Sequence, residues 1–429
     1  MVTGTTLSPV FPLGSRLSER GRLEVGGCDV IELAREFGTP AYVVAEDDLR
    51  ARARAFLQAG RDAGHTDLHV VFASKAFPCS AVLELFAAEG LWCDVASGGE
   101  LHLALRSGFG PERVVLHGNA KSEEELRRAL AGGVGLIVLD NFDEIERLER
   151  LIAEGQLGDR PSQEVLVRVT PDVRGETHEK ISTGQADSKF GFSMAHAPRA
   201  IERAGEVAGL SLRGLHAHIG SQLLELHPFH REVEELASLG DFPVWDLGGG
   251  LGVQYTADQP APPSIEEYVC ALVGAARGHG MAAPGRRLLI EPGRALCANA
   301  GVTLYTVQSV KQNVSRWVAV DGGMSDNLRP MLYGAAYEAH VADRFDGELE
   351  CVLAGKHCES GDVIVPRALL DDPRAGDVLV TPATGAYGFA MANNYNGVPR
   401  PPVIFCRDGD ARVVVRRESF EDLTSRDVI

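Results

Sequence analysis

The sequence contains no apolar run of the roughly 20 residues that a membrane-spanning helix requires. Its N-terminal stretch, MVTGTTLSPVFPLGSRLSER, lacks the basic-then-apolar order of a secretory signal peptide. Basic residues are in deficit, because 42 lysines and arginines face 60 aspartates and glutamates and leave a formal net charge of -18. Such a surface disfavours binding to nucleic acids and to anionic membranes. We therefore expect a cytoplasmic protein that has neither of these partners.

The sequence also lacks the paired cysteines of a disulfide framework. It has 8 cysteines in 429 residues, and no two of them form a CxxC pair. In a chain of this length, scattered cysteines are typical of reduced cytosolic thiols. One of them, Cys358, stands in the turn GKHCESGD, between a histidine and two acids. This local pattern alone leaves four interpretations open: a metal ligand, a nucleophile, half of a disulfide or a buried filler.

A regular alternation of strands and helices begins at about residue 68. Short apolar runs of β type alternate with amphipathic stretches of helical period. Strands that are apolar throughout are typical of parallel sheets, which are buried on both faces. Eight such strand–helix units predict a (β/α)8 TIM-type barrel, which we assign to residues 41–294. The runs are LHVVFASK, LWCDVAS, RVVLHGN, GLIVLDN, EVLVRVTP, LRGLHAHIGS, FPVWDLGGG and RLLIEPGR.

Two regions outside the barrel have a different texture. Residues 295–429 contain runs that alternate apolar and polar residues, with DG turn signals between some of them, and predict an all-β domain. Residues 1–40 include a possible strand pair, GRLEVGGCDV, and we expect them to join that domain. Within the barrel the spacing widens once, at residues 171–192. A polar insertion at the C-terminal end of a barrel strand predicts an active-site loop.

Nearly every predicted barrel strand ends in polar or glycine residues. Barrel active sites are built from the C-terminal ends of the strands. Any one of these residues can instead be a helix cap or an ordinary loop residue. Eight such ends around one ring, however, favour an active site. The polar residues are Lys75, Asp94, His117, Asn119, Asp140, Arg168, His216, His218, Asp246, Glu291 and Arg294.

Lys75 is the most informative of these positions. A lysine at the end of an apolar run is costly to bury, and burial lowers the pKa of its amine. A neutral amine is suited to Schiff-base chemistry. The alternative is a surface lysine at the start of a loop.

Three consecutive glycines in DLGGGLG, residues 246–252, indicate an anion site. Glycine lets backbone N–H groups approach an anion closely, and that anion is typically a phosphate. The spacing is not GxGxxG, which disfavours a dinucleotide fold, whereas barrels commonly bind phosphate after a late strand. A tight turn without a ligand is the alternative.

Two further motifs offer groups for a charged aromatic ligand. In EPGR, Glu291 can hold a ring nitrogen protonated and Arg294 can pair with a phosphate or carboxylate, unless the two form an internal salt bridge. In HAHIGSQ, His218 can lie flat on an aromatic ring and Ser221 can bind phosphate. His216 and His218 can instead bind a metal, but no third ligand accompanies them at metal spacing, so we expect no metal site.

A lysine, a phosphate-binding loop, a carboxylate for a ring nitrogen and a flat histidine together describe a site for pyridoxal 5'-phosphate. The chain resembles the fold-type III pyridoxal-phosphate decarboxylases, which belong to the superfamily of alanine racemase and ornithine decarboxylase. The matching motifs run in the family's order from about residue 68 to 396, with departures at Phe72 and Phe77, where relatives often carry tyrosine and asparagine. They are FASKA, CDVASGGEL, LHGNAKS, THEKISTGQADSKFGF, HAHIGSQ, DLGGGLG, EPGRA, DGGMSDNLRPMLYGA, GKHCESGD and ATGAYGFAMANNYN.

The resemblance implies a homodimer with shared active sites and a role for individual residues. Lys75 would bind the cofactor covalently, and Cys358 would supply the proton that replaces the departing carboxylate. Cys358 and Glu359 would come from the partner chain. The other cofactor-binding residues would be Asp94, His218, Ser221, Gly248, Gly249, Gly250, Glu291, Gly293, Arg294 and Tyr387. The substrate would be bound by Arg294, Arg329, Tyr333, Glu359 and Tyr387.

The resemblance also implies an activity, the removal of CO2 from meso-2,6-diaminopimelate to give L-lysine, which is the last step of bacterial lysine biosynthesis. The DNLRPMLY segment and Glu359 offer the guanidinium, phenol and carboxylate needed to hold a second zwitterionic centre. One alternative is a related decarboxylase that acts on ornithine, arginine, a carboxylated polyamine or a carrier-tethered amino acid. The polyamine branch of the family carries CDGxD where this chain has CESGD, which disfavours that alternative. A second alternative is a catalytically inactive binding protein, which is expected to have lost the lysine or the cysteine, but Lys75 and Cys358 are both present. A racemase would need a second base for the opposite face, and the cysteine motif argues against it.

Overall fold

The computed structural model describes residues 7–173 and 188–428. The chain forms two compact units. The first consists of Met1–Ala51, Val253–Ala261 and Leu296–Ile429, and the second consists of Arg52–Gly252 and Pro262–Ala295. Most of the loop predicted at residues 171–192 lies outside the described residues. The domain boundaries predicted at residues 40 and 294 stay predictions.

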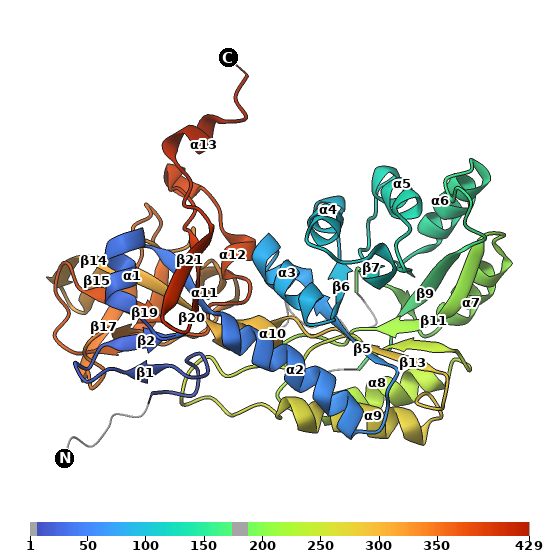
Figure 1. Ribbon diagram of the computed structural model, residues 1–429, viewed down its shortest axis with the longest axis horizontal. Helices are drawn as coiled ribbons and strands as arrows, with labels where there is room; N and C mark the ends of the chain where they lie inside the picture. The colour runs from blue at the N-terminus through green and yellow to red at the C-terminus, as the bar shows by residue number, and fades with distance from the viewer. Residues whose placement is uncertain (1–6, 174–187, 429) are drawn as a thin grey trace. The chain divides into compact units, whose positions relative to one another are not determined.

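The second unit is a closed barrel of parallel strands. Each strand pairs with the next around the ring, and β9 closes the ring by pairing with both β8 and β11. The predicted barrel fold is therefore confirmed (Figure 1). A short strand, β10 (Phe192–Ser193), adds to β9 outside the ring. In ring order the strands are β9 (Gln163–Thr170), β11 (Leu210–Ala217), β12 (Val244–Asp246), β13 (Arg287–Ile290), β5 (Leu68–Ala73), β6 (Trp92–Val95), β7 (Val114–Leu116) and β8 (Leu136–Leu139).

Branched apolar side chains fill the interior of the barrel. Val71, Val115, Leu166, Val244 and Leu289 are fully buried members of one cluster and come from different strands. Bulky branched residues in layers are typical of such interiors, which are packed cores and not pores. A ligand can therefore bind only at the ends of the strands.

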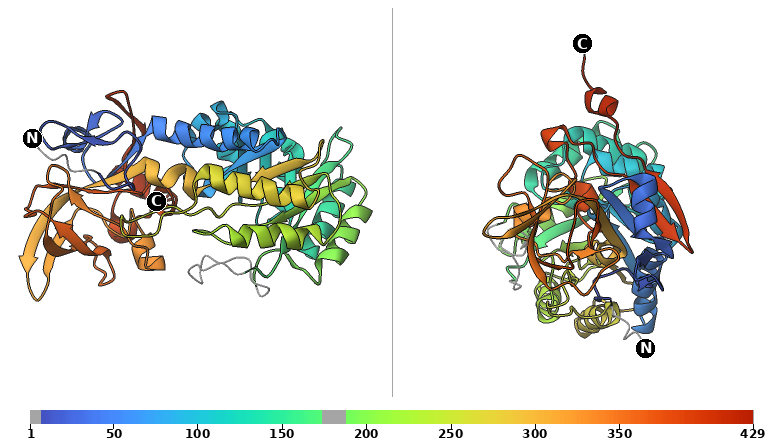
Figure 2. Two further views of the ribbon diagram at one scale, coloured as in Figure 1. Left: turned by 90° about the horizontal axis from the view of Figure 1, so that it is seen from below. Right: turned by 90° about the vertical axis from the view of Figure 1, so that its left-hand side faces the viewer.

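Amphipathic helices cover the outside of the barrel, and side chains cap several of them. Ser122 and Ser264 each form a capping box with a glutamate three residues further on. Helices α8 and α9 lie side by side (Figures 1 and 2). No helix in the described part of the chain is long and apolar enough to cross a membrane. These helices are α2 (Glu46–Asp62), α3 (Ser80–Ala88), α4 (Gly98–Arg106), α5 (Glu123–Gly132), α6 (Phe142–Ala153), α7 (Ala197–Glu206), α8 (His227–Ala237) and α9 (Ile265–Gly278). A short buried helix, α10 (Arg294–Cys297), follows β13.

The first unit is built mainly on one sheet, so the strand-rich region predicted after the barrel is confirmed. The sheet has the order β18-β17-β15-β14-β4-β20-β21, and β19 pairs with both β14 and β16. A separate sheet has the order β1-β2-β3. The strands are β1 (Arg16–Leu17), β2 (Leu23–Val25), β3 (Cys28–Asp29), β4 (Ala41–Ala45), β14 (Gly301–Gln312), β15 (Arg316–Val320), β16 (His340–Val341), β17 (Leu349–Ala354), β18 (Val363–Leu370), β19 (Val378–Thr381), β20 (Val403–Arg407) and β21 (Asp410–Val415). The short helices of this unit are α1 (Val30–Phe37), α11 (Arg329–Tyr333), α12 (Gly388–Met391) and α13 (Phe420–Thr424).

Strand β4 lies between two strands that come much later in the chain. It runs antiparallel to β14 and parallel to β20, with Val43 opposite both Val302 and Ile404. All of its residues are buried. The beginning and the end of the chain therefore meet in one sheet.

Candidate active site

Lys75 and Asp94 lie next to each other at the ends of two neighbouring barrel strands. Lys75 is in the 3-10 turn η1 (Ser74–Ala76), directly after β5, and Asp94 lies in β6 opposite Ala73. The Lys75 Nζ donates a hydrogen bond of 3.3 Å to Asp94 Oδ2. Asp94 is buried, whereas the Lys75 side chain is 48% exposed. A buried carboxylate thus orients the amine, and the amine stays accessible to a ligand.

Glu291 follows β13 and is held between two histidines. His117 Nε2 lies 2.7 Å from Glu291 Oε1, and His216 Nε2 lies 3.2 Å from Oε2. Burial by itself raises the pKa of Glu291, but the two imidazoles lower it to well below its usual value, so the carboxyl stays ionised. Burial lowers the pKa of His216 to about 3. This imidazole is therefore neutral and donates its Nε2–H to the carboxylate.

The residues around Glu291 also have the composition of a metal site. One ligand atom each from His117, His216, Asp246 and Glu291 lies within 4.8 Å of the others, a grouping that sequence spacing did not reveal. However, the 2.7 Å between His117 Nε2 and Glu291 Oε1 is shorter than the ~3.3 Å between two ligands of a tetrahedral zinc ion with bonds of about 2.0–2.1 Å. The arrangement is that of side chains paired with one another.

The glycines after β12 form a tight loop that requires glycine. Gly248 has a φ of 57°, and a Cβ there would lie 2.3 Å from the Ala217 carbonyl oxygen. A Cβ on Gly249 would lie 2.1 Å from the Glu291 carbonyl oxygen. The Gly249 N–H donates to His218 Nδ1 at 3.1 Å, and burial lowers the pKa of His218 to well below its usual value. The loop therefore brings bare backbone beside a neutral imidazole of defined orientation.

The predicted phosphate-binding residues lie at the same end of the barrel. Arg294 Nη2 donates a hydrogen bond of 2.9 Å to Ser221 Oγ. Gly293 packs closely against β5, because a Cβ there would lie 3.0 Å from the Cβ of Ala73. Gly250 has a φ of 127°, in the region that favours glycine. A guanidinium, a hydroxyl and a glycine loop are the groups with which proteins commonly bind phosphate.

The end of the barrel also contains buried polar atoms that a ligand can satisfy. His216 Nδ1 and Asp140 Oδ1 are buried and have no hydrogen-bond partner among the described residues. Nearly all buried polar atoms in proteins are hydrogen-bonded, so such atoms are typical of a site that a polar ligand completes. With an amine, an ionised carboxylate and a phosphate-binding group beside them, the residues present fit pyridoxal phosphate.

In the first unit, Arg329 is the most enclosed of the predicted site residues. It begins helix α11 and is buried, and its guanidinium lies 4.5 Å and 5.5 Å from the ring centres of Tyr255 and Tyr337. Its Nη1 also donates to the Tyr337 hydroxyl. Burial by itself lowers the pKa of Arg329, but Tyr255, Tyr337 and Tyr387 raise it to above its usual value. A guanidinium held in this way keeps its charge and can pair with a carboxylate.

The other predicted residues of the first unit are more accessible. Cys358 and Glu359 are exposed in the turn between β17 and β18. Tyr333 ends helix α11, and Tyr387 precedes α12 with a φ of 64°. Their participation in one site with the barrel residues stays a prediction.

Two networks behind these residues were not predicted from the sequence. His117, His216 and Asp246 were expected at strand ends, but without a role next to Glu291. The second network is the buried pair of His357 and Asp362, which flanks Cys358. The signal available for that pair was a histidine and an acid at the two ends of a glycine-rich turn.

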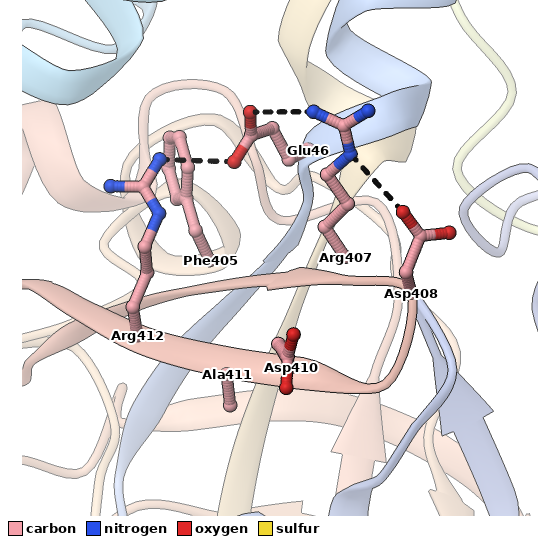
Figure 3. A pocket seen from close by; sticks show the side chains of 7 residues that line it. All are labelled: Glu46, Phe405, Arg407, Asp408, Asp410, Ala411 and Arg412. Atoms are coloured by element: carbon pink, nitrogen blue, oxygen red, sulfur yellow. Dashed lines mark hydrogen bonds and ion pairs between the residues drawn. The ribbon is translucent and has the colours of Figure 1, made fainter.

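A separate pocket lies on the β20–β21 hairpin, and none of the predicted site residues lines it. Its volume is about 340 Å³ (Figure 3). Glu46 lies between Arg407 and Arg412, at 3.7 Å and 3.0 Å from their guanidinium nitrogens, and Arg407 also reaches Asp408. Since these charges neutralise one another, we assign the pocket no ligand.

The chain is similar to enzymes of one family over nearly its whole length. Residues 46–298 match a family described as pyridoxal-dependent decarboxylase, pyridoxal binding domain. The chain is 48% identical to the diaminopimelate decarboxylase of Actinosynnema pretiosum subsp. auranticum, over 98% of this chain and 95% of that one. It is 45% identical to the diaminopimelate decarboxylase of Bacillus subtilis (strain 168), over 96% of this chain and 97% of that one. A crystal structure of diaminopimelate decarboxylase from M. jannaschii in co-complex with L-lysine is similar with a TM-score of 0.89 and 32% identity, over 97% of this chain and 98% of that one.

Proposed function

Because the chain belongs to the family of pyridoxal-dependent decarboxylases, we propose that it removes CO2 from meso-2,6-diaminopimelate and releases L-lysine. Two relatives that share 48% and 45% of its sequence carry the name diaminopimelate decarboxylase. The similar M. jannaschii enzyme was crystallised with L-lysine. The observation that carries the proposal is the group of side chains at the strand ends of the barrel, with Lys75 beside Asp94 and an ionised Glu291.

When bound, pyridoxal phosphate supplies an electron sink for the charge that remains after CO2 departs. We assign Lys75 to its aldehyde carbon, because this amine is accessible and is oriented by Asp94. We assign Glu291 to the ring nitrogen, because an ionised carboxylate keeps such a nitrogen protonated. The neutral imidazole of His218 is suited to lie flat against the ring.

The phosphate is assigned to the loops that follow β11, β12 and β13, at the same end of the barrel. Arg294 and Ser221 are already hydrogen-bonded to each other and offer a charge and a hydroxyl. The loop of Gly248, Gly249 and Gly250 lets backbone approach the phosphate without side chains in the way. These groups would hold the phosphate of the cofactor, while Lys75 would bind its aldehyde carbon.

The proposed substrate carries an amino group and a carboxylate at each end, so its distal end needs binding partners of its own. We assign Arg329 to the distal carboxylate, because an arginine binds a carboxylate through two parallel hydrogen bonds. Glu359 supplies a negative charge for the distal ammonium group, and Tyr333 and Tyr387 supply hydroxyls. A diamino acid without the distal carboxylate offers the Arg329 guanidinium no anionic partner, which disfavours the binding of such a substrate.

The proton that replaces the carboxylate is assigned to Cys358. A thiol can act as an acid when it is positioned beside the carbon that takes up the proton. Cys358 and Glu359 are exposed in the single chain. We propose that they serve the barrel of a second copy, so that the active form is a homodimer with shared sites.

A substrate panel tests the proposal. Purified protein with pyridoxal phosphate is offered meso-, LL- and DD-diaminopimelate, ornithine, arginine and lysine, and CO2 release is measured. We expect release from the meso isomer alone, with the Lys75→Ala variant as the background.

The alternative function is that of a related decarboxylase for ornithine, arginine, a carboxylated polyamine or a carrier-tethered amino acid. Turnover of ornithine or arginine with a kcat/KM comparable to that of the meso isomer would replace the first proposal by this one. The buried, ring-stacked Arg329 favours a substrate with a distal carboxylate.

A further inference from the structure

The turn that carries Cys358 is fixed by one buried carboxylate. The side chain of Asp362 is only 3% exposed and accepts three hydrogen bonds from the protein. They come from Met324 N–H at 2.7 Å, His357 N–H at 2.9 Å and His357 Nδ1 at 2.8 Å. Asp362 therefore uses its acceptors inside the protein, whereas its neighbours Cys358 and Glu359 face outward.

Glycines on both sides leave room for this carboxylate. A Cβ on Gly323 would lie 2.5 Å from Asp362 Oδ1, and a Cβ on Gly355 would lie 2.1 Å from Oδ2. The backbones of the two segments are also joined, because Lys356 N–H donates to Gly322 O at 2.9 Å. The loop of residues 322–324 and the turn of residues 355–362 are thus joined by hydrogen bonds and packed closely around one carboxylate.

A third segment holds the same turn from its other side. The Cys358 N–H donates to Asn396 Oδ1 at 3.0 Å. The His357 ring stacks on Tyr395, with ring centres 5.9 Å apart and planes inclined by 29°. The His357 side chain is fully buried, and its Nε2 has no hydrogen-bond partner among the described residues. The ring is therefore held through Nδ1 and through its face.

We infer that His357 and Asp362 are positioning residues, which fix the backbone of the turn from which Cys358 delivers its proton. This inference rests on the proposed function only where it says what Cys358 does. An acid must lie within hydrogen-bond reach of the atom that it protonates, and misplacement by about 1 Å costs a rate factor of up to ~10². The side chains of His357 and Asp362 are buried behind the turn and act through the position of the thiol.

Two substitutions of His357 separate the hydrogen bond from the ring. His357→Asn places an amide N–H at the position of Nδ1 and keeps the bond to Asp362. His357→Phe keeps a ring against Tyr395 and loses that bond. We expect kcat for CO2 release to fall about 10-fold or more in His357→Phe and to stay within about 2-fold in His357→Asn, with little change in KM.

Three further measurements distinguish positioning from a general loss of structure. The visible absorbance of bound cofactor and the unfolding temperature are expected to be similar in both variants. In heavy water, the deuterium that replaces the carboxylate is expected on one face with wild type and His357→Asn, and on both faces with His357→Phe. Amide hydrogen exchange at residues 355–362 is expected to speed up in His357→Phe alone.

The outcomes test the positioning role of His357 and Asp362 separately from the proposed decarboxylase function. Full kcat in His357→Phe, or an equal loss in both variants, overturns the positioning role. Faster exchange in His357→Phe in a protein that decarboxylates none of the panel substrates supports the positioning of the turn and overturns the proposed function. Unchanged exchange with unchanged deuterium placement overturns the inference, whatever the substrate.

Discussion

Lys75 owes its position and its accessibility to different neighbours. The strand pair β5 and β6 places it beside Asp94, and its own position in the turn η1 lies just beyond the end of β5. The carboxylate keeps the amine oriented, and the 48% exposure of the side chain keeps it reachable. A single residue at the end of a buried strand can therefore be both fixed and reactive.

Lys75→Ala is expected to abolish both the visible absorbance of bound cofactor and CO2 release. Lys75→Arg is the matched control, because it keeps a positive charge for Asp94 but has no amine that can attack an aldehyde. Both variants are expected to be colourless after dialysis, whereas wild type keeps its band. An active, colourless Lys75→Ala protein would contradict the role of this lysine.

Cys358→Ala is expected to lower kcat by about 10² and to leave cofactor absorbance unchanged, since the proton donor is lost but the barrel is intact. Cys270→Ala is the control, because Cys270 is also exposed but lies in helix α9 of the barrel. Steady-state CO2 release measures both. A Cys358→Ala variant with the kcat of wild type would make this thiol a structural one.

Burial decides how much an ion pair contributes to stability. Lys121 Nζ lies 2.7 Å from Glu144 Oε1, and both side chains are almost fully buried, whereas Arg128 and Glu124 pair at 2.8 Å on the surface. Lys121→Met leaves a buried carboxylate without its cation and is expected to cost about 3–5 kcal/mol of unfolding free energy. Arg128→Ala is expected to cost less than about 1 kcal/mol. Urea unfolding compares the two, and equal losses would contradict this reading.

At the scale of elements, the loop after β15 depends on a carboxyl that titrates near neutral pH. Asp326 is buried, its oxygens accept from Tyr305 OH at 2.5 Å and from Gly323 N–H at 2.7 Å, and its carbonyl accepts from Tyr42 OH. Burial raises the pKa of Asp326 to about 7, although the Tyr305 hydroxyl and the Gly323 N–H lower it. The carboxyl whose charge depends on pH thus joins strand β14 to this loop, whereas strand β4 bonds to the backbone of the same residue.

The raised pKa of Asp326 fixes the sign of a pH effect. Between about pH 4 and 7 the folded state keeps a proton that the unfolded state has released, so the contribution of this group to stability falls as pH rises. We expect Asp326→Asn to remove that fall. Urea midpoints of wild type and variant, measured from pH 5 to 8, are expected to differ in slope.

Tyr305→Phe serves as the matched variant for this effect. It removes a hydrogen bond that lowers the pKa of Asp326, so the fall in stability is expected to extend to higher pH. Parallel pH profiles for wild type and both variants would contradict the assignment to Asp326.

The elements differed in how well the sequence predicted them. Strands such as β5 and β13 were predictable because each is a short apolar run with a polar end, buried on both faces in a barrel. Strand β4 was not predicted, because its place in a sheet depends on partners that lie far along the chain, at residues 301–304 and 403–406. Strand β16 is only two residues long and offers no periodicity to detect.

The candidate site was predictable to a similar degree. Lys75, Glu291 and the glycine loop were predictable from their positions at strand ends and from their residue types. The ionisation of Glu291 was not predictable, since it depends on His117 and His216 from other strands. The hydrogen bonds of the Asp362 carboxylate were not predictable either, because one of their donors, Met324, lies in a loop far along the chain.

At the scale of the whole molecule, the proposed sharing of sites between two chains makes a testable demand. Lys75→Ala and Cys358→Ala are each expected to be nearly inactive as homodimers. In a mixed dimer, one of the two sites combines an intact Lys75 with an intact Cys358. After subunit exchange of an equal mixture, about a quarter of wild-type activity is expected, because half of the dimers are mixed and each has one complete site.

The control for this experiment is the exchange itself. Differently tagged subunits that co-purify show that mixed dimers have formed. No recovery of activity in a mixture that has exchanged would argue against sites shared between chains.

The position of β4 has a consequence for the nascent chain. Translation produces β4 first, then all the strands of the barrel, and only afterwards β14 and β20, its two neighbours. An apolar strand without neighbours is a site where chains associate wrongly, and domains commonly fold as they are made. A ribosome that pauses between residues 312 and 403 therefore holds a chain with all the strands of the barrel, together with a β4 that has β14 on one side but still lacks β20 on the other.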